Sequence, residues 1–187
     1  FVDDFLQAVE LKYALMPYIY AQAKQSSANG YPMLRALFFE YPGDPTCWFI
    51  DDEYMFGTDL LVAPLFEEGE ARNVYLPPGV WIDYQTGAEY EGNQWHEITA
   101  GAVPVIILVR NHAVIPHIKV AQSTVDMDWS QIELRIFSSE DSPAEGLIAL
   151  PDGELHLLEL RVDDGSFKLK EDPFQNKIDW EITIGLK

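Results

Sequence analysis

The chain has 187 residues, of which 31 are Asp or Glu and 12 are Lys or Arg, so its formal net charge is −19. We expect neither a nucleic-acid nor a membrane partner, because binding to phosphate groups depends on clusters of Lys and Arg. Hydrophobic residues make up 48% of the sequence, enough to fill a folded core. The length accommodates one or two domains but excludes a complete (β/α)8 barrel, which takes about 250 residues.

Cys47 is the only cysteine, which excludes an intramolecular disulfide and a metal site built from several cysteines. No run reaches the roughly 18 apolar residues of a membrane span, and no signal sequence opens the chain. Residue 1 is Phe and lies inside a helical pattern, so we expect a fragment or a processed product. We expect a cytoplasmic location.

Residues 1–30 are predicted to form one helix, which Asn29-Gly30 ends. Pro17 removes a backbone donor and should kink this helix or divide it in two. Apolar side chains recur at steps of three and four residues and wrap widely around the helix. We therefore expect it to pack against a surface outside this chain. The clearest apolar positions are Val2, Phe5, Leu6, Val9, Tyr13 and Met16.

Residues 31–117 change to short apolar runs separated by Gly, Pro and Asp, a spacing typical of a β-sandwich. The candidate strands are residues 33–41, 60–66, 72–76, 81–84, 103–110 and 113–115.

Residues 118–187 continue this style and are predicted to form a second antiparallel β-domain. Ile178, Trp180 and Ile182 alternate with polar residues, as a half-buried strand requires. Asp163-Asp164-Gly165 is typical of a hairpin turn. The predicted fold is therefore mainly β, with two antiparallel β-sandwich-like domains (31–117 and 118–187) preceded by one α-helix.

The acidic residues show no metal-binding pattern. None of their runs has the ligand spacing of a calcium loop, and Asp126 with Asp128 is too small a set. The four histidines form neither a zinc pair nor a hydrolase triad. We therefore predict no metal site and no cofactor. The histidines are His96, His112, His117 and His156.

The tryptophans allow a second interpretation, because aromatic rings stack on sugars. Trp48, Trp95 and Trp129 lie near turns and are the surface candidates, whereas Trp81 and Trp180 are predicted to lie in the core. An alternative function is therefore a carbohydrate-binding β-sandwich module, with an oligosaccharide as a possible partner. A calcium-dependent adhesion domain ranks below it because the ligand spacing is missing.

Four ordered blocks resemble family 31 glycoside hydrolases. The first is LKYALMPYIYAQAKQSSANGYPMLRALFFEYPGDP at residues 11–45, similar to the junction between the last barrel helix and the following β-domain. The others are DDEYMFGTDLLVAPLFEEG at 51–69, YLPPGVWIDYQTGAEYEG at 75–92 and VPVIILVRNHAVIP at 103–116. Residues 118–187 correspond by position to the distal C-terminal domain. The amino-acid sequences of the first two blocks resemble α-xylosidase-type members more than the lysosomal α-glucosidase type.

This resemblance implies a parent enzyme that hydrolyses terminal α-linked sugars with retention, using an aspartate nucleophile and an aspartate acid/base. Both belong to barrel strands, which we expect upstream of Phe1. The sequence Val125-Asp126-Met127-Asp128-Trp129 shares letters with a nucleophile motif but follows the β-domain blocks, so we assign no catalytic residue. Substrate-binding residues are not assigned. The expected partner is the barrel of the same polypeptide, and the unpartnered helix predicts self-association.

Several residues of the blocks are implied to be structural. The family usually has Arg-x-Gly where this chain has Arg110-Asn111-His112, which affects the local turn. The structural residues are Arg35 and Glu40 in the first strand, Gly57 and Asp59 before an apolar strand, and Trp81, Asp83 and Gly87 around a turn.

Overall fold

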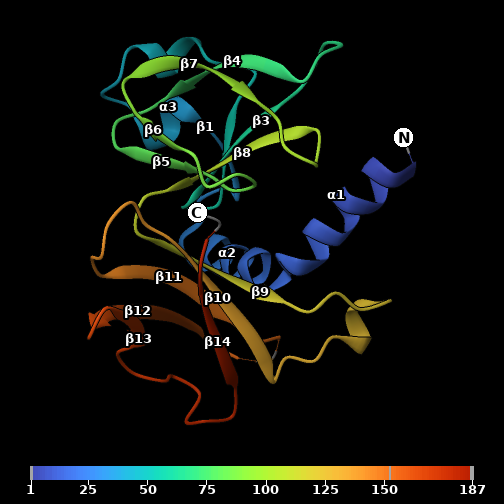
Figure 1. Ribbon diagram of the computed structural model, residues 1–187, viewed down its shortest axis with the longest axis vertical. Coiled ribbons are helices and arrows are strands. Elements are labelled where there is room, and N and C mark those ends of the chain that lie inside the picture. The colour runs from blue at the N-terminus through green and yellow to red at the C-terminus, as the bar shows by residue number, and fades with distance from the viewer. Residues whose placement is uncertain (1, 152, 186–187) are drawn as a thin grey trace. The chain divides into compact units, whose positions relative to one another are not determined.

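The computed structural model describes residues 2–151 and 153–185 (Figure 1). The chain is mainly β with two N-terminal helices, which confirms the predicted class. The one helix of the predicted fold is two helices, which is one of the two outcomes expected of Pro17. The contacts of the chain divide it into two units, described separately below. The helical unit contains residues 2–31 and 112–185, without residue 152, and the middle unit contains residues 32–111.

The division into domains 1–30, 31–117 and 118–187 stays a prediction. These ranges include residues 1, 152, 186 and 187, which lie outside the described residues. The contact-based units differ from them in two ways. The N-terminal helices group with the C-terminal strands, and the change between units falls between Asn111 and His112.

The predicted helix is two helices, α1 (Val2–Ala14) and α2 (Met16–Asn29), because Pro17 stands in the first turn of α2. Gly30 ends α2 with φ of 77°, the left-handed conformation that glycine adopts readily, and its N–H donates to the carbonyl of Ser26.

The two helices differ in burial. α2 packs against two strands of its own unit, β9 (Ala113–Ile118) and β11 (Ala144–Ala149), and its Tyr18 and Ala21 are buried. The expectation of an external partner is therefore wrong for α2. α1 buries no residue, and Phe5 is 66% exposed.

The middle unit contains a six-stranded sheet in the order β1-β2-β3-β8-β5-β6, antiparallel throughout, and a β4–β7 pair. Its core takes Met55 and Leu61 from the large sheet and Val74 and Ile98 from the pair. The elements are β1 (Leu34–Ala36), α3 (Leu37–Glu40), η1 (Thr46–Phe49), β2 (Tyr54–Phe56), β3 (Leu60–Pro64), β4 (Ala71–Leu76), β5 (Val80–Asp83), β6 (Glu89–Glu91), β7 (Gln94–Thr99) and β8 (Val105–Arg110).

The predicted strand 33–41 is corrected. Only β1 is a strand, and the second half is the short helix α3, whose Leu37 is fully buried. Periodicity does not separate strand from helix in so short an apolar run.

The helical unit contains a six-stranded sheet in the order β13-β12-β11-β9-β10-β14. The hairpin turn at Asp163-Asp164-Gly165 is confirmed, with φ of 51° at Asp164 and 72° at Gly165. Its elements beyond the helices are β9 (Ala113–Ile118), η2 (Thr124–Asp126), β10 (Gln131–Phe137), β11 (Ala144–Ala149), β12 (Leu155–Asp163), β13 (Ser166–Leu169) and β14 (Asp179–Ile184).

The expectation that residues 113–115 join the sheet of the preceding strands is wrong. They begin β9, which pairs with β10 along its length and meets β11 only at Ala113. Pro116 therefore lies in β9 where β11 forms no ladder with it, so the missing proline N–H costs no bond on that side.

The prediction of a purely antiparallel second sheet is also corrected. β14 pairs with β10 in parallel, with Trp180 opposite Ile132, and the single β11–β9 contact is parallel too. Alternation along one strand identifies its buried face but not the direction of its neighbour.

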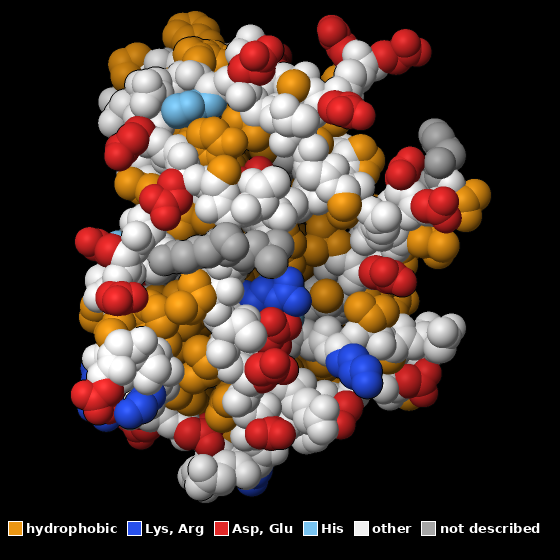
Figure 2. Space-filling model, viewed as in Figure 1, with side chains coloured by type: hydrophobic (Ala, Val, Ile, Leu, Met, Phe, Trp, Pro, Cys, Tyr) orange, Lys and Arg blue, Asp and Glu red, His pale blue; other side chains and the backbone are white. Residues whose placement is uncertain are grey.

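Acidic side chains are distributed over the visible face of the molecule and are not gathered in one place (Figure 2). Among the described residues, no helix has the length and apolar character needed to cross a membrane.

Candidate functional site

The three surface tryptophans lie in separate places. In the middle unit, Trp48 stacks on Phe38 with ring centroids 5.1 Å apart, and Trp95 packs against Tyr75 at 5.5 Å. Both are more than half exposed. Trp129 belongs to the helical unit and is half-buried. The candidates therefore do not form one binding platform within either unit.

The two tryptophans predicted to be core residues are packed. Trp81 is 1% exposed and donates from Nε1 to the carbonyl of Pro77 at 2.9 Å. Trp180 packs at the edge of the helical unit's core, with its ring 6.0 Å from that of Phe174.

The acidic candidates serve local turns. Asp126 accepts from the Ser123 hydroxyl at 2.7 Å. Asp128 accepts from the backbone and hydroxyl of Ser130, and these hydrogen bonds lower the pKa of its carboxyl. Across the described ranges, no group of three His, Cys, Asp or Glu side chains is placed to hold a metal ion.

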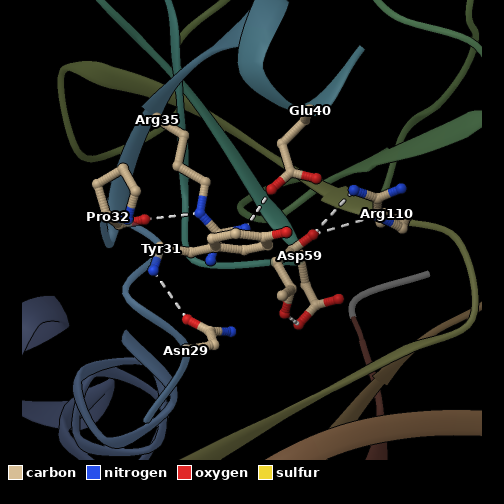
Figure 3. A network of polar contacts seen from close by, with 8 residues as sticks. Asn29, Tyr31, Pro32, Arg35, Glu40, Asp59 and Arg110 are labelled. Atoms are coloured by element: carbon tan, nitrogen blue, oxygen red, sulfur yellow. Dashed lines mark hydrogen bonds and ion pairs between the residues drawn. The ribbon is translucent and has the colours of Figure 1, made fainter. Parts of the chain in front are cut away.

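A polar network surrounds the first strand of the middle unit (Figure 3). Arg35 is buried, donates from Nε to the carbonyl of Pro32 at 2.6 Å, and forms an ion pair with Glu40. Arg110 donates two hydrogen bonds to the carbonyl of Thr58, at 2.9 and 3.2 Å. These charges hold backbone segments together, which is the structural role implied for Arg35 and Glu40.

The Asp83 carboxylate likewise holds a backbone segment, the turn that follows it. Asp83 is 2% exposed, and its Oδ1 accepts the backbone N–H groups of Gln85 and Thr86, both at 2.8 Å. Gly87 closes the turn with φ of 74°. The carboxylate is therefore occupied by two donors.

Glu53 is a second buried acid of the middle unit. Its Oε1 accepts the Tyr75 N–H at 2.9 Å and lies 3.6 Å from Arg72, while its Oε2 is buried with no hydrogen-bond partner. Burial raises the pKa of this carboxyl from 4.5 to about 7, although the Tyr75 N–H and the Arg72 charge oppose the shift.

His117 is the buried base of the helical unit. Its Nδ1 lies 2.8 Å from the carbonyl of Ile115, and the Arg135–Glu133 ion pair belongs to the neighbouring strand. Burial lowers the pKa of this imidazole from 6.5 to about 4, and the Arg135 charge acts in the same direction. His117 is therefore neutral near pH 7.

His112 stands where the resemblance to the family implies a glycine. Its φ is 64°, the left-handed conformation that glycine adopts without strain. Its Nδ1 lies 3.0 Å from the Ser138 hydroxyl and 2.9 Å from the Ser142 hydroxyl. These hydrogen bonds compensate for the backbone conformation.

One pocket of the helical unit combines aromatic and polar side chains. Its volume is about 570 Å³, and Trp129, His156, Phe174, Gln175 and Lys177 line it. Sequence analysis found only Trp129. Asp172-Pro173 was the available signal for the loop, because Asp and Pro favour turns, but no local pattern joins residues 129, 156 and 174.

Known proteins identify the middle region. Residues 30–115 match the glycosyl hydrolase family 31 C-terminal domain. The chain is 31% identical over 147 residues to α-glucosidase 2 of Bacillus thermoamyloliquefaciens, covering 78% of the chain and 19% of that protein. It is 30% identical over 161 residues to an α-xylosidase of Emericella nidulans, covering 82% of the chain and 19% of that protein.

A solved structure supports the same family assignment. The family 31 dextranase of Flavobacterium johnsoniae, complexed with glucose, superposes with a TM-score of 0.78 at 28% identity, covering 87% of this chain and 22% of that one. The matched region is thus the C-terminal domain of a carbohydrate-active enzyme family. The chain belongs to glycoside hydrolase family 31, as the predicted resemblance implied, and corresponds to the C-terminal part of its larger enzymes. It spans between 11% and 19% of the length of the first curated relatives it matches.

Proposed function

We propose that this chain is the non-catalytic C-terminal region of a retaining α-glycosidase that hydrolyses terminal α-linked sugars. The observation that carries the proposal is the match of residues 30–115 to the family 31 C-terminal domain. In this proposal its sandwich-like β-domains brace a catalytic barrel carried by the same polypeptide. A cytoplasmic location remains a prediction.

The roles of the acids support this proposal. Retaining hydrolysis needs two carboxyl groups about 5–5.5 Å apart facing one sugar. The Asp126 and Asp128 side chains are instead occupied by serine donors, and Asp83 and Glu53 each accept backbone N–H groups. Their contacts are those of structural residues.

Exposed apolar side chains mark the surfaces that would contact the catalytic barrel. On α1, Val2 and Phe5 are 70% and 66% exposed, and in the middle unit Phe49 is 85% exposed beside Trp48. Large exposed apolar groups close together mark contact surfaces. In the parent enzyme we propose that the barrel covers them. In the isolated chain, α1 is then a site for self-association.

The substrate is an α-xyloside or an α-glucoside. An α-xylosidase and an α-glucosidase match the chain at similar identity, so both remain within the proposal. The amino-acid sequence of residues 51–69 resembles that of α-xylosidase-type members, which favours the α-xyloside.

The test compares the chain with a longer polypeptide in which a family 31 catalytic region precedes it. We expect the 187-residue chain to release no p-nitrophenol from p-nitrophenyl α-xyloside or α-glucoside, and the longer polypeptide to hydrolyse one of them with retention. Turnover by the chain alone that disappears in Asp126→Asn or Asp128→Asn would overturn the proposal.

The alternative, a carbohydrate-binding module that uses surface aromatics, is favoured by one observation. Trp129 lines a pocket together with a second aromatic ring and polar side chains.

A further inference from the structure

The aromatic pocket of the helical unit is formed by three segments far apart in the sequence. Trp129 precedes β10, His156 stands in β12, and Phe174, Gln175 and Lys177 belong to the loop before β14. Its volume of about 570 Å³ lies within the usual range for small-molecule sites.

The helix α2 holds two walls of this pocket. Tyr20 contacts Trp129 edge to face, with ring centroids 6.1 Å apart, and donates from its hydroxyl to the carbonyl of Pro151. Lys24 donates to the carbonyl of Gly153 at 2.5 Å. Trp129 and the β11–β12 turn are therefore tied to one rigid element.

The third wall is a constrained loop. The Asp172 carboxylate accepts the backbone N–H of Phe174 at 2.9 Å and that of Asn176 at 2.6 Å. Gln175 and Asn176 have φ of 56° and 62°, a conformation that non-glycine residues adopt only when their surroundings impose it. Phe174 is further packed by His156, whose ring centroid is 4.9 Å away.

The charge of the pocket differs from that of the chain. The chain carries 31 acidic residues, yet the described residues that line this pocket include no carboxylate. The polar groups are the His156 imidazole, the Gln175 amide and the Lys177 ammonium. Two aromatic rings with hydrogen-bonding groups around them suit an uncharged ring that has apolar faces and hydroxyls at its edge.

We propose that this pocket binds a neutral saccharide, one or two sugar rings of an α-linked chain. Trp129 and Phe174 contact the apolar faces of the ring, and Gln175 and Lys177 bind its hydroxyls. The choice of a saccharide rests on the proposed function, since a family 31 parent works on α-linked sugars. The pocket itself rests on the geometry alone.

The test titrates the full 187-residue chain with isomaltose and with isoprimeverose, followed by ¹H–¹⁵N NMR. We expect shifts at the indole N–H of Trp129 and at the backbone of residues 173–177. Trp129→Ala should weaken binding by roughly tenfold or more, the effect of about 1.4 kcal/mol. Trp95→Ala, which removes an exposed tryptophan of the middle unit, should leave the affinity unchanged.

A second variant covers the possibility that Trp129→Ala unfolds the unit. Gln175 and Lys177 are exposed, so the double substitution Gln175→Ala, Lys177→Ala should keep the fold and weaken binding severalfold. Absence of shifts at millimolar sugar, or equal weakening by Trp95→Ala, would overturn the proposal. Tighter binding of glucose 6-phosphate than of glucose would contradict the proposal that the ligand is neutral.

Failure here is distinguishable from failure of the proposed function. If the chain binds no sugar and hydrolyses no substrate, the sugar-binding proposal fails but the bracing role stands. A chain that hydrolyses substrate by itself overturns the bracing role whatever the titration shows.

Discussion

Each unit buries a titratable side chain whose pKa is strongly shifted, Glu53 in the middle unit and His117 in the helical unit, and the two shifts have opposite consequences. In the middle unit, burial raises the pKa of the Glu53 carboxyl to about 7. In the helical unit, burial lowers the pKa of the His117 imidazole to about 4. Burial favours the neutral form in both cases, but the neutral form of an acid is protonated and that of a base is not. The same physical cause therefore gives opposite responses to pH.

The largest expected effect is the pH dependence of the wild-type chain. Between pH 4.5 and 7, folded Glu53 keeps a proton that the unfolded chain has lost, so the middle unit loses stability as pH rises. Between pH 6.5 and 4, unfolded His117 gains a proton that the folded state rejects, so the helical unit loses stability as pH falls. Each contribution is on the order of 3 kcal/mol, from 1.36 kcal/mol per pKa unit.

Urea unfolding at several pH values, with hydrogen-exchange labelling read from peptides of each unit, measures both responses. Parallel changes of the two units with pH would contradict the comparison.

The second prediction removes the acid. Glu53→Gln eliminates the titrating group, so the decline of the middle unit between pH 4.5 and 7 should flatten while the response of the helical unit stays the same. Glu89→Gln, which removes an exposed carboxylate of the same unit, is the matched control. If Glu89→Gln flattens the decline as much as Glu53→Gln does, overall charge rather than burial causes it.

The third prediction removes the base. His117→Asn keeps a side-chain donor near the carbonyl of Ile115 but does not titrate, so the helical unit should stop losing stability between pH 6.5 and 4. Its stability at pH 7 should fall by roughly 1–3 kcal/mol, because a smaller side chain leaves a cavity. The slope is the decisive measurement. A slope equal to that of the wild type would show that His117 does not govern the acid response.

The smallest expected effect concerns His112. His112→Ala keeps the left-handed backbone and loses the contacts with Ser138 and Ser142, whereas His112→Gly also loses them but relieves the backbone. We expect the glycine variant to be more stable than the alanine variant by about 1 kcal/mol. Urea unfolding at pH 7 measures the difference. The opposite order would show that backbone strain is unimportant at this turn.

Local features of the fold were predictable. Pro17 predicts the division into α1 and α2, Gly30 predicts the end of α2, and Asp164-Gly165 predicts the hairpin, because each signal acts within a few residues. Pairing was not predictable in the same way. The direction of β14 and the sheet that β9 joins depend on strands far away in the sequence.

The candidate site shows the same limit. Trp129 could be selected from the sequence, because an aromatic residue near a turn is a candidate for a surface contact. His156 and Phe174 could not, since only the folded sheet brings β12 and the loop before β14 to Trp129. The pKa shifts of Glu53 and His117 were hidden for the same reason, because burial is a property of the packed unit.

The helical unit is discontinuous in sequence, so its two parts are synthesised at different times. Residues 32–111 have all been synthesised before the first strand of the other unit exists, so the middle unit can fold first. α2 is made early, but β9 and β11 emerge only later. Until then the strands that bury its apolar side chains are missing. Within the helical unit, α2 is therefore synthesised well before the strands that bury it, and its packing is completed only after the middle unit has been made.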